Sequence, residues 1–102
     1  MTRANVRVLD GGMGRELKRI GAPFRQPEWS ALALIEAPEY VLQAHQAFVK
    51  AGARIITTNS YAVVPFHIGD ERFAEQGRAL AERAGRLARQ AAGESTDAVT
   101  VA

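Results

Sequence analysis

The order of apolar segments along the chain limits its possible folds more than any other sequence feature. Short apolar runs at 6–10, 54–58 and 98–102 alternate with two longer segments, 38–52 and 70–92, whose apolar residues recur at helical spacing. Such a β-α-β-α-β order predicts parallel strands joined by helical crossovers. Both a doubly wound sheet and an eight-stranded barrel are built in this way, and three strands complete neither. The sequence therefore predicts an α/β fold of which only the first β-α-β-α-β portion is present.

The boundaries of the two long helices can be read from single residues. Pro38 suits the first position of a helix, and Gly52 suits the position just after its end. Asp70 is expected to be the N-cap of the second long helix. Between the elements, we expect 59–69 to be a loop containing a proline, whereas the apolar piece 29–35 has no clear type. Continuous apolar residues in Ile55-Ile56 and Val99 to Val101 suit strands that are covered on both faces.

Composition excludes several classes of protein. Hydrophobic residues make up 47% of the chain and charged residues 24%, which is typical of a globular protein. No apolar run approaches the ~20 residues that a membrane span needs, and the N-terminus lacks a secretory signal, so we expect a cytoplasmic protein without membrane contact. The net charge is only +2, and five of the eleven arginines are interspersed with glutamates along one predicted helix, which argues against nucleic-acid binding. The absence of cysteine excludes thiolate metal ligands within these residues.

Polar residues follow the first two predicted strands, where parallel α/β folds bind their ligands. Asp10, Gly11 and Gly12 end the first strand, and Asn59 and Tyr61 come just after the second. Asp10 could bind an ammonium group, and the glycines would let backbone N–H groups approach a ligand. Two alternatives remain open at this point: Asp10 could cap local amides in a turn, and Tyr61 could pack beneath the following loop.

Other candidate sites have weaker support in the sequence. The glycines at 11, 12 and 14 do not form a dinucleotide-binding G-x-G-x-x-G pattern, and no acidic residue ends the second strand, so a nucleotide cofactor is not expected. His45 lies between apolar positions of a helix and His67 lies in a loop. Two isolated histidines in unrelated contexts are more typical of structural or exposed residues than of metal ligands.

Five segments in the same order resemble the homocysteine S-methyltransferase family, which includes the homocysteine-binding module of methionine synthase and the betaine-homocysteine methyltransferases. The segments are Asp10-Gly11-Gly12-Met13-Gly14 with Glu16-Leu17, Trp29-Ser30-Ala31, Pro38-Glu39 with the helix to His45, Ala51-Gly52-Ala53, and Ile56 to Tyr61. The similarity covers the chain from about Val6 to Ala102. Arg15 departs from the family, which usually has threonine there.

The resemblance implies a (β/α)8 TIM barrel that transfers a methyl group to the zinc-bound thiolate of homocysteine, giving methionine. By position, Asp10 matches the residue that binds the homocysteine amino group, with Gly11 and Gly12 beside it. Tyr61 matches a tyrosine near the metal in some members, and Asn59 belongs to the motif of the second strand. The family holds zinc through three cysteines on later strands, and this sequence has none, so these residues cannot bind zinc in that way.

We therefore interpret residues 1–102 as the N-terminal portion of a homocysteine-binding barrel domain, truncated and inactive alone. Its small-molecule partners would be homocysteine and a methyl donor of unknown type. The alternative is a non-enzymatic short α/β protein that self-associates through its open sheet edge or completes a split barrel with another chain. A third reading is a different α/β-barrel enzyme with an aspartate at the end of its first strand.

Overall fold

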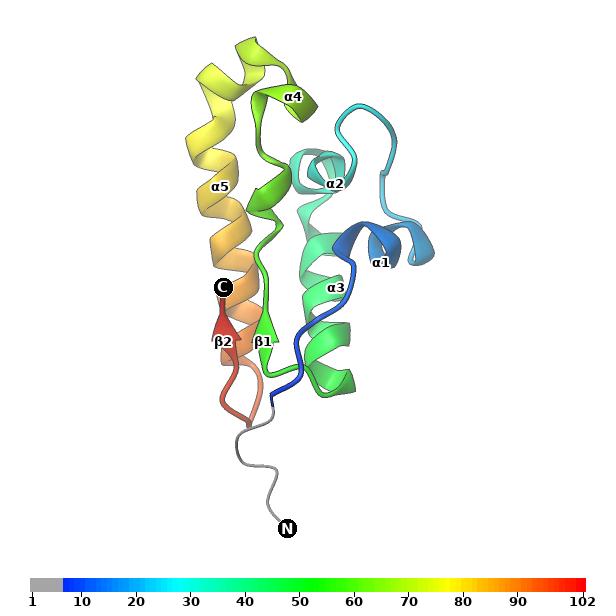
Figure 1. The fold of residues 1–102 in the computed structure, drawn as a ribbon, viewed down its shortest axis with the longest axis vertical. Coiled ribbons are helices and arrows are strands. Elements are labelled where there is room, and N and C mark those ends of the chain that lie inside the picture. The colour runs from blue at the N-terminus through cyan, green and yellow to red at the C-terminus, as the bar shows by residue number, and fades with distance from the viewer. Residues whose placement is uncertain (1–6) are drawn as a thin grey trace.

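The strands form one short parallel sheet in the computed structural model, which describes residues 7–102 (Figure 1). Strand β1 (Ile55–Ile56) pairs with β2 (Thr100–Val101), so that Ile55 lies opposite Thr100. On the other side of β1, Leu9 forms a single parallel bridge to Ile55. The expected parallel pairing is thus confirmed, although the regular strands are only two residues long. Val6, where the first strand was expected to begin, lies outside the described residues.

Two long helices lie against this sheet, as the helical spacing predicts. Helix α3 (Pro38–Ala51) ends at Gly52, whose φ of 117° is in the left-handed region that favours glycine. Helix α5 (Asp70–Gly93) packs against α3 along the molecule (Figure 1). The prediction that Asp70 is the N-cap was wrong: Gly69 occupies the cap position and Asp70 is the first helical residue. The Asp70 carboxylate still lies in the first turn, where the helix dipole favours negative charge.

Four shorter helices connect these elements, and two of them occur where a loop was expected. Helices α1 (Met13–Arg19) and α2 (Ser30–Glu36) precede α3. The 3₁₀ helix η1 (Asn59–Ala62) and helix α4 (Pro65–Ile68) occupy most of 59–69. The loop prediction failed there because Pro65 starts a helix rather than breaking one, since its missing N–H costs nothing at the first position.

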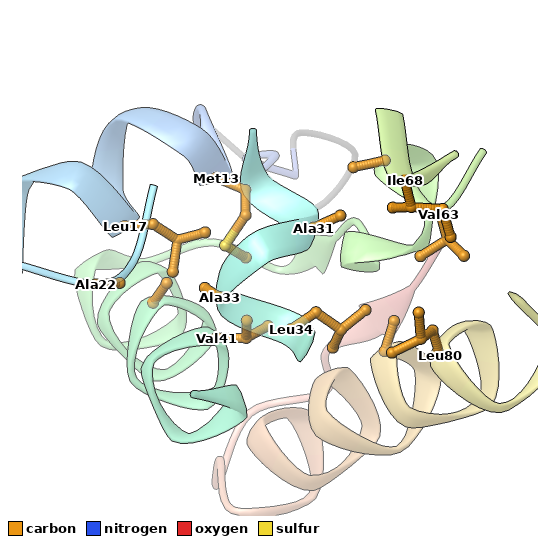
Figure 2. Packing of buried hydrophobic residues seen from close by; sticks show 13 residues of the cluster. Met13, Leu17, Ala22, Ala31, Ala33, Leu34, Val41, Val63, Ile68 and Leu80 are labelled. Atoms are coloured by element: carbon orange, nitrogen blue, oxygen red, sulfur yellow. The ribbon is translucent and has the colours of Figure 1, made fainter. Parts of the chain in front are cut away.

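The main hydrophobic core lies between the helices rather than under the sheet. It joins α1, α2, α3 and α5, and in Figure 2 Leu34 of α2 points toward Leu80 of α5. Leu34 is fully buried. A second, smaller cluster lies where α3 and α5 cover one face of the strands, and its fully buried members are Ile56 and Ala88. Most of the apolar burial therefore depends on helix packing.

The strands are covered only in part. Ile56 is buried, whereas Ile55, Val99 and Val101 are half-buried and Thr100 is exposed, so the expectation of coverage on both faces is met by Ile56 alone. In the N-terminal segment, Val8 is 58% exposed and Leu9 is 61% exposed. The structure confirms a mostly helical α/β domain with a parallel sheet, while the eight-stranded barrel stays a prediction. Within residues 7–102, no helix is long and apolar enough to cross a membrane.

Candidate functional site

The carboxylate of Asp10 is held at the end of the sheet by the neighbouring strand. Its own backbone N–H donates to the carbonyl oxygen of Ile55 at 3.0 Å, which continues the parallel pairing. The backbone N–H of Thr57 donates to Oδ2 of Asp10 at 2.9 Å, and the Thr57 hydroxyl donates to Oδ1 at 3.3 Å. An ionised carboxylate has about four acceptor positions. Two remain for a ligand, so Asp10 is both fixed and able to bind a cation.

Gly11 and Gly12 follow Asp10 in different surroundings. A Cβ atom on Gly11 would lie 3.0 Å from Cε1 of Phe48, because the turn passes directly over that ring of α3. A Cβ on Gly12 would meet only the Cβ of Arg15, at 3.7 Å. The approach of the turn to Phe48 therefore leaves little room for a side chain at position 11, whereas position 12 is open.

This difference predicts unequal effects of the same substitution at the two glycines. Gly11→Ala is expected to destabilise the chain by about 1–3 kcal/mol, because the Phe48 ring must move out of a packed interface. Gly12→Ala is the matched control and should cost less, at most about 1 kcal/mol: its φ of −73° suits alanine, although Gly12 is the N-cap of α1, where glycine is preferred. Urea unfolding of both variants measures the difference. Equal stabilities would show that the turn does not pass over Phe48 as described.

Tyr61 and Asn59 are both tied to the start of α2, but their side chains are exposed to different degrees. The Tyr61 hydroxyl accepts a hydrogen bond from the Ser30 hydroxyl at 2.8 Å, while its side chain stays largely exposed. Asn59 is fully buried, and its Nδ2 donates to the Ser30 carbonyl oxygen at 2.9 Å. Asn59 Oδ1 has no hydrogen-bond partner within residues 7–102. Asn59 is thus a buried residue that holds the start of α2, whereas the exposed Tyr61 side chain can contact a ligand.

A hollow of about 310 Å³ brings most of the predicted site residues together. It is lined by Leu9, Asp10, Gly11, Gly12, Met13, Thr57 and Tyr61. Four of the five residues predicted from the sequence therefore share one surface, and the fifth, Asn59, lies outside its lining. Thr57 was not predicted as a site residue, although a polar side chain at the end of a strand was a usable signal.

Two larger hollows lie away from the carboxyl ends of the strands. One of about 430 Å³ opens at the start of α5, where Arg72 lies 3.6 Å from Glu28. The other, of about 360 Å³, surrounds the ion pair between Arg54 and Asp97, with 2.8 Å between the charged atoms. In both, charged groups of the rim partly compensate one another. The hollow at Asp10 differs from both. Its carboxylate accepts two hydrogen bonds from Thr57 and forms no ion pair with the other residues of 7–102.

His45 of α3 is buried, close enough to Asp10 to be affected by its charge, and was not predicted as a site residue. Its side chain is fully buried, and neither ring nitrogen has a hydrogen-bond partner within residues 7–102. Phe48, one turn further along α3, contacts Gly11, while Met13 belongs to the same core cluster as Ala44. Burial lowers the pKa of His45 below its ordinary value, and the negative charge of Asp10 opposes that shift. The imidazole is therefore neutral near pH 7.

Comparison with known proteins decides the family. The model of the family described as homocysteine S-methyltransferase matches residues 7–102. The chain belongs to this family. Homocysteine S-methyltransferase 1 of Brassica oleracea var. italica is 33% identical over 94 residues, which is 91% of this chain and 29% of that protein. The homocysteine S-methyltransferase of Escherichia coli (strain K12) is 33% identical over 92 residues, or 89% of this chain and 30% of that protein.

A selenocysteine methyltransferase of Astragalus bisulcatus is 39% identical over 85 residues, covering 82% of this chain and 25% of that protein. The chain thus spans about 25–30% of the length of these three relatives. No solved structure matches it. Among residues 7–102, no three histidine, cysteine, aspartate or glutamate side chains lie close enough together to hold a metal ion.

Proposed function

We propose that residues 1–102 supply the amino-acid-binding part of a homocysteine S-methyltransferase, in which a methyl group passes from a small donor to the sulfur of homocysteine. The observation that supports this most directly is the Asp10 carboxylate, oriented by two hydrogen bonds from Thr57 at the rim of a hollow. A fixed carboxylate binds an ammonium group through charge-assisted hydrogen bonds. Because Thr57 holds both oxygens, little side-chain entropy is lost when the ligand binds.

The other residues of the site fit the remainder of a small amino acid. The turn at Gly11 and Gly12 has no side chain that would keep a ligand away from the backbone. Leu9 and Met13 supply apolar walls for the methylene groups of homocysteine. Tyr61 offers a hydroxyl on the same hollow. In this proposal Asn59 acts indirectly, by holding the start of α2 on which Tyr61 depends.

Zinc, which the family resemblance implies, does not fit the residues of this chain. The family binds it through cysteine thiolates, and the sequence has no cysteine. Residues 7–102 also offer no alternative cluster of metal ligands. We therefore propose that these 102 residues alone bind substrate without transferring a methyl group. The complete site would be that of a (β/α)8 barrel to which further strands contribute.

The substitution Asp10→Asn tests this function through binding rather than turnover. It is expected to weaken homocysteine binding by about 10- to 100-fold, the value of one hydrogen bond to a charged group. Binding of 4-mercaptobutanoate, which lacks the amino group, should not change. Isothermal titration or NMR titration of the chain measures both ligands. Asp97→Asn, the same change at the opposite end of the sheet, is the matched control and should leave both affinities intact.

Two outcomes would contradict the proposal: a wild-type chain that does not bind homocysteine, or an Asp10→Asn chain that binds it as well as the wild type.

The exposed Val8 and Leu9 favour a second candidate function, in which an open sheet surface associates with another polypeptide. Pairing has been found on only one side of β2 within the described residues. A monomeric ligand-free chain in sedimentation equilibrium would exclude self-association.

A further inference from the structure

Ser30 connects two residues of the site that are distant from it in sequence. It is the first residue of α2 and is only 2% exposed. Its hydroxyl donates to the Tyr61 hydroxyl oxygen at 2.8 Å, and its carbonyl oxygen accepts from Nδ2 of Asn59 at 2.9 Å. Asn59 and Tyr61 both belong to η1, so Ser30 joins the start of α2 to two positions of that short helix.

The direction of the hydrogen bond decides what Tyr61 can do. A phenol has one donor proton and also accepts through its oxygen. Because the Ser30 hydroxyl already donates to that oxygen, the Tyr61 proton is free to be donated to another group. The Tyr61 side chain is 55% exposed and lines the hollow with Asp10. The site thus has a carboxylate for a cationic group and a hydroxyl donor for an acceptor group.

The backbone before Ser30 adopts an unfavourable conformation that fixes this arrangement. Trp29 has a φ of 51° and a ψ of −129°, a combination that is uncommon for any residue other than glycine. Its N–H donates to the Arg25 carbonyl oxygen at 2.8 Å, and its ring packs on Phe24 with 5.7 Å between centroids. Such strain persists only where surrounding contacts impose it, and it is concentrated at functional sites. Here it places Ser30 at the start of α2, facing Tyr61.

We propose that Ser30 is a positioning residue for ligand binding. It holds the Tyr61 hydroxyl so that the phenolic proton is directed into the hollow, toward an acceptor atom of the bound amino acid. Asn59 keeps Ser30 in place through its carbonyl group. This inference rests on the proposed function for the identity of the ligand, but the contact between Ser30 and Tyr61 can be tested without any ligand.

The first measurement is the ¹³Cζ chemical shift of tyrosine in the labelled 102-residue chain. Ser30→Ala is expected to shift the Tyr61 resonance, because its oxygen loses a donor, and to leave Tyr40 unchanged as an internal control. Ser30→Thr keeps the hydroxyl and should restore the Tyr61 shift, whereas Ser30→Cys should resemble Ser30→Ala. The cysteine variant also replaces alanine if that variant does not fold. An unchanged Tyr61 resonance in both Ser30→Ala and Ser30→Cys would overturn the proposal.

The second measurement is homocysteine affinity in a double-mutant cycle. Ser30→Ala is expected to weaken binding by about 3- to 10-fold, the range of one neutral hydrogen bond, and to have no further effect in a Tyr61→Phe background. An equal loss in both backgrounds, or no loss in either, would refute the positioning role even though Asp10→Asn still weakens binding. If the wild type does not bind homocysteine, the proposed function fails, and the ¹³C shifts alone decide the role of Ser30.

Discussion

Leu34→Ala is expected to reduce the free energy of unfolding by about 2–5 kcal/mol, the usual cost of deleting a buried leucine side chain. Leu34 is fully buried in the cluster that joins α2 to α5 through Leu80 (Figure 2). The carbonyl oxygen of Leu34 accepts a hydrogen bond from Arg83 at 3.1 Å, and alanine keeps that backbone acceptor. The predicted loss therefore reflects packing and the cavity left behind, not a lost hydrogen bond.

Leu9→Ala is the matched control for this prediction. It removes the same atoms from a side chain that is 61% exposed, so a much smaller loss is expected. Urea unfolding followed by circular dichroism measures both variants. Single domains of this size have a total stability of only about 5–15 kcal/mol, so the difference should be readily visible. Similar losses in the two variants would mean that α2 does not pack against α5 as the structure describes.

The elements that could be predicted from the sequence are those indicated by the spacing of residues close together along the chain. Helices α3 and α5 follow from amphipathic spacing, and Gly52 marks the end of α3 through its left-handed conformation. The grouping of Asp10 with Tyr61 followed from a general property of parallel sheets, in which all strands end at the same edge. These features require no knowledge of contacts between distant residues.

The features that the sequence did not predict depend on tertiary contacts. Helix α2 is buried from Ser30 to Leu34, so it has no polar face and shows no amphipathic period. The hydrogen bond between Ser30 and Tyr61 joins residues 31 positions apart, and no local pattern indicates it. His45 is fully buried although its neighbours along α3 are only partly apolar, so its burial depends on how α3 packs against other elements.

Acidification is expected to destabilise the chain through His45. Burial holds the pKa of this histidine below its ordinary value of 6.5, so the folded state binds a proton less readily than the unfolded state. The contribution of the neutral imidazole is fully present above about pH 6.5. It is lost as the pH falls through the lower pKa of the folded state. Within that window the free energy of unfolding should decrease by up to about 1.4 kcal/mol per pH unit.

Comparing unfolding at pH 7.5 and at pH 5 in two histidine variants isolates this effect. His45→Leu removes the titrating group, so its stability should change less between the two pH values than that of the wild type. His67→Gln alters the only other histidine, which is half-buried, and should keep the wild-type dependence. The readout is the change between pH values, because leucine also alters packing. A His45→Leu chain as acid-sensitive as the wild type would show that His45 does not control this loss.

The same titration connects stability to the candidate site, because the charge of Asp10 opposes the effect of burial on His45. Asp10→Asn removes that charge and should lower the pKa of His45 further, extending the window of acid sensitivity to lower pH. NMR titration of the His45 ring in wild type and Asp10→Asn measures this directly. An ammonium ligand on Asp10 would neutralise the same charge, so homocysteine binding should move the pKa of His45 in the same direction as the substitution. If Asp10→Asn leaves the His45 titration unchanged, His45 and the Asp10 carboxylate are not electrostatically linked.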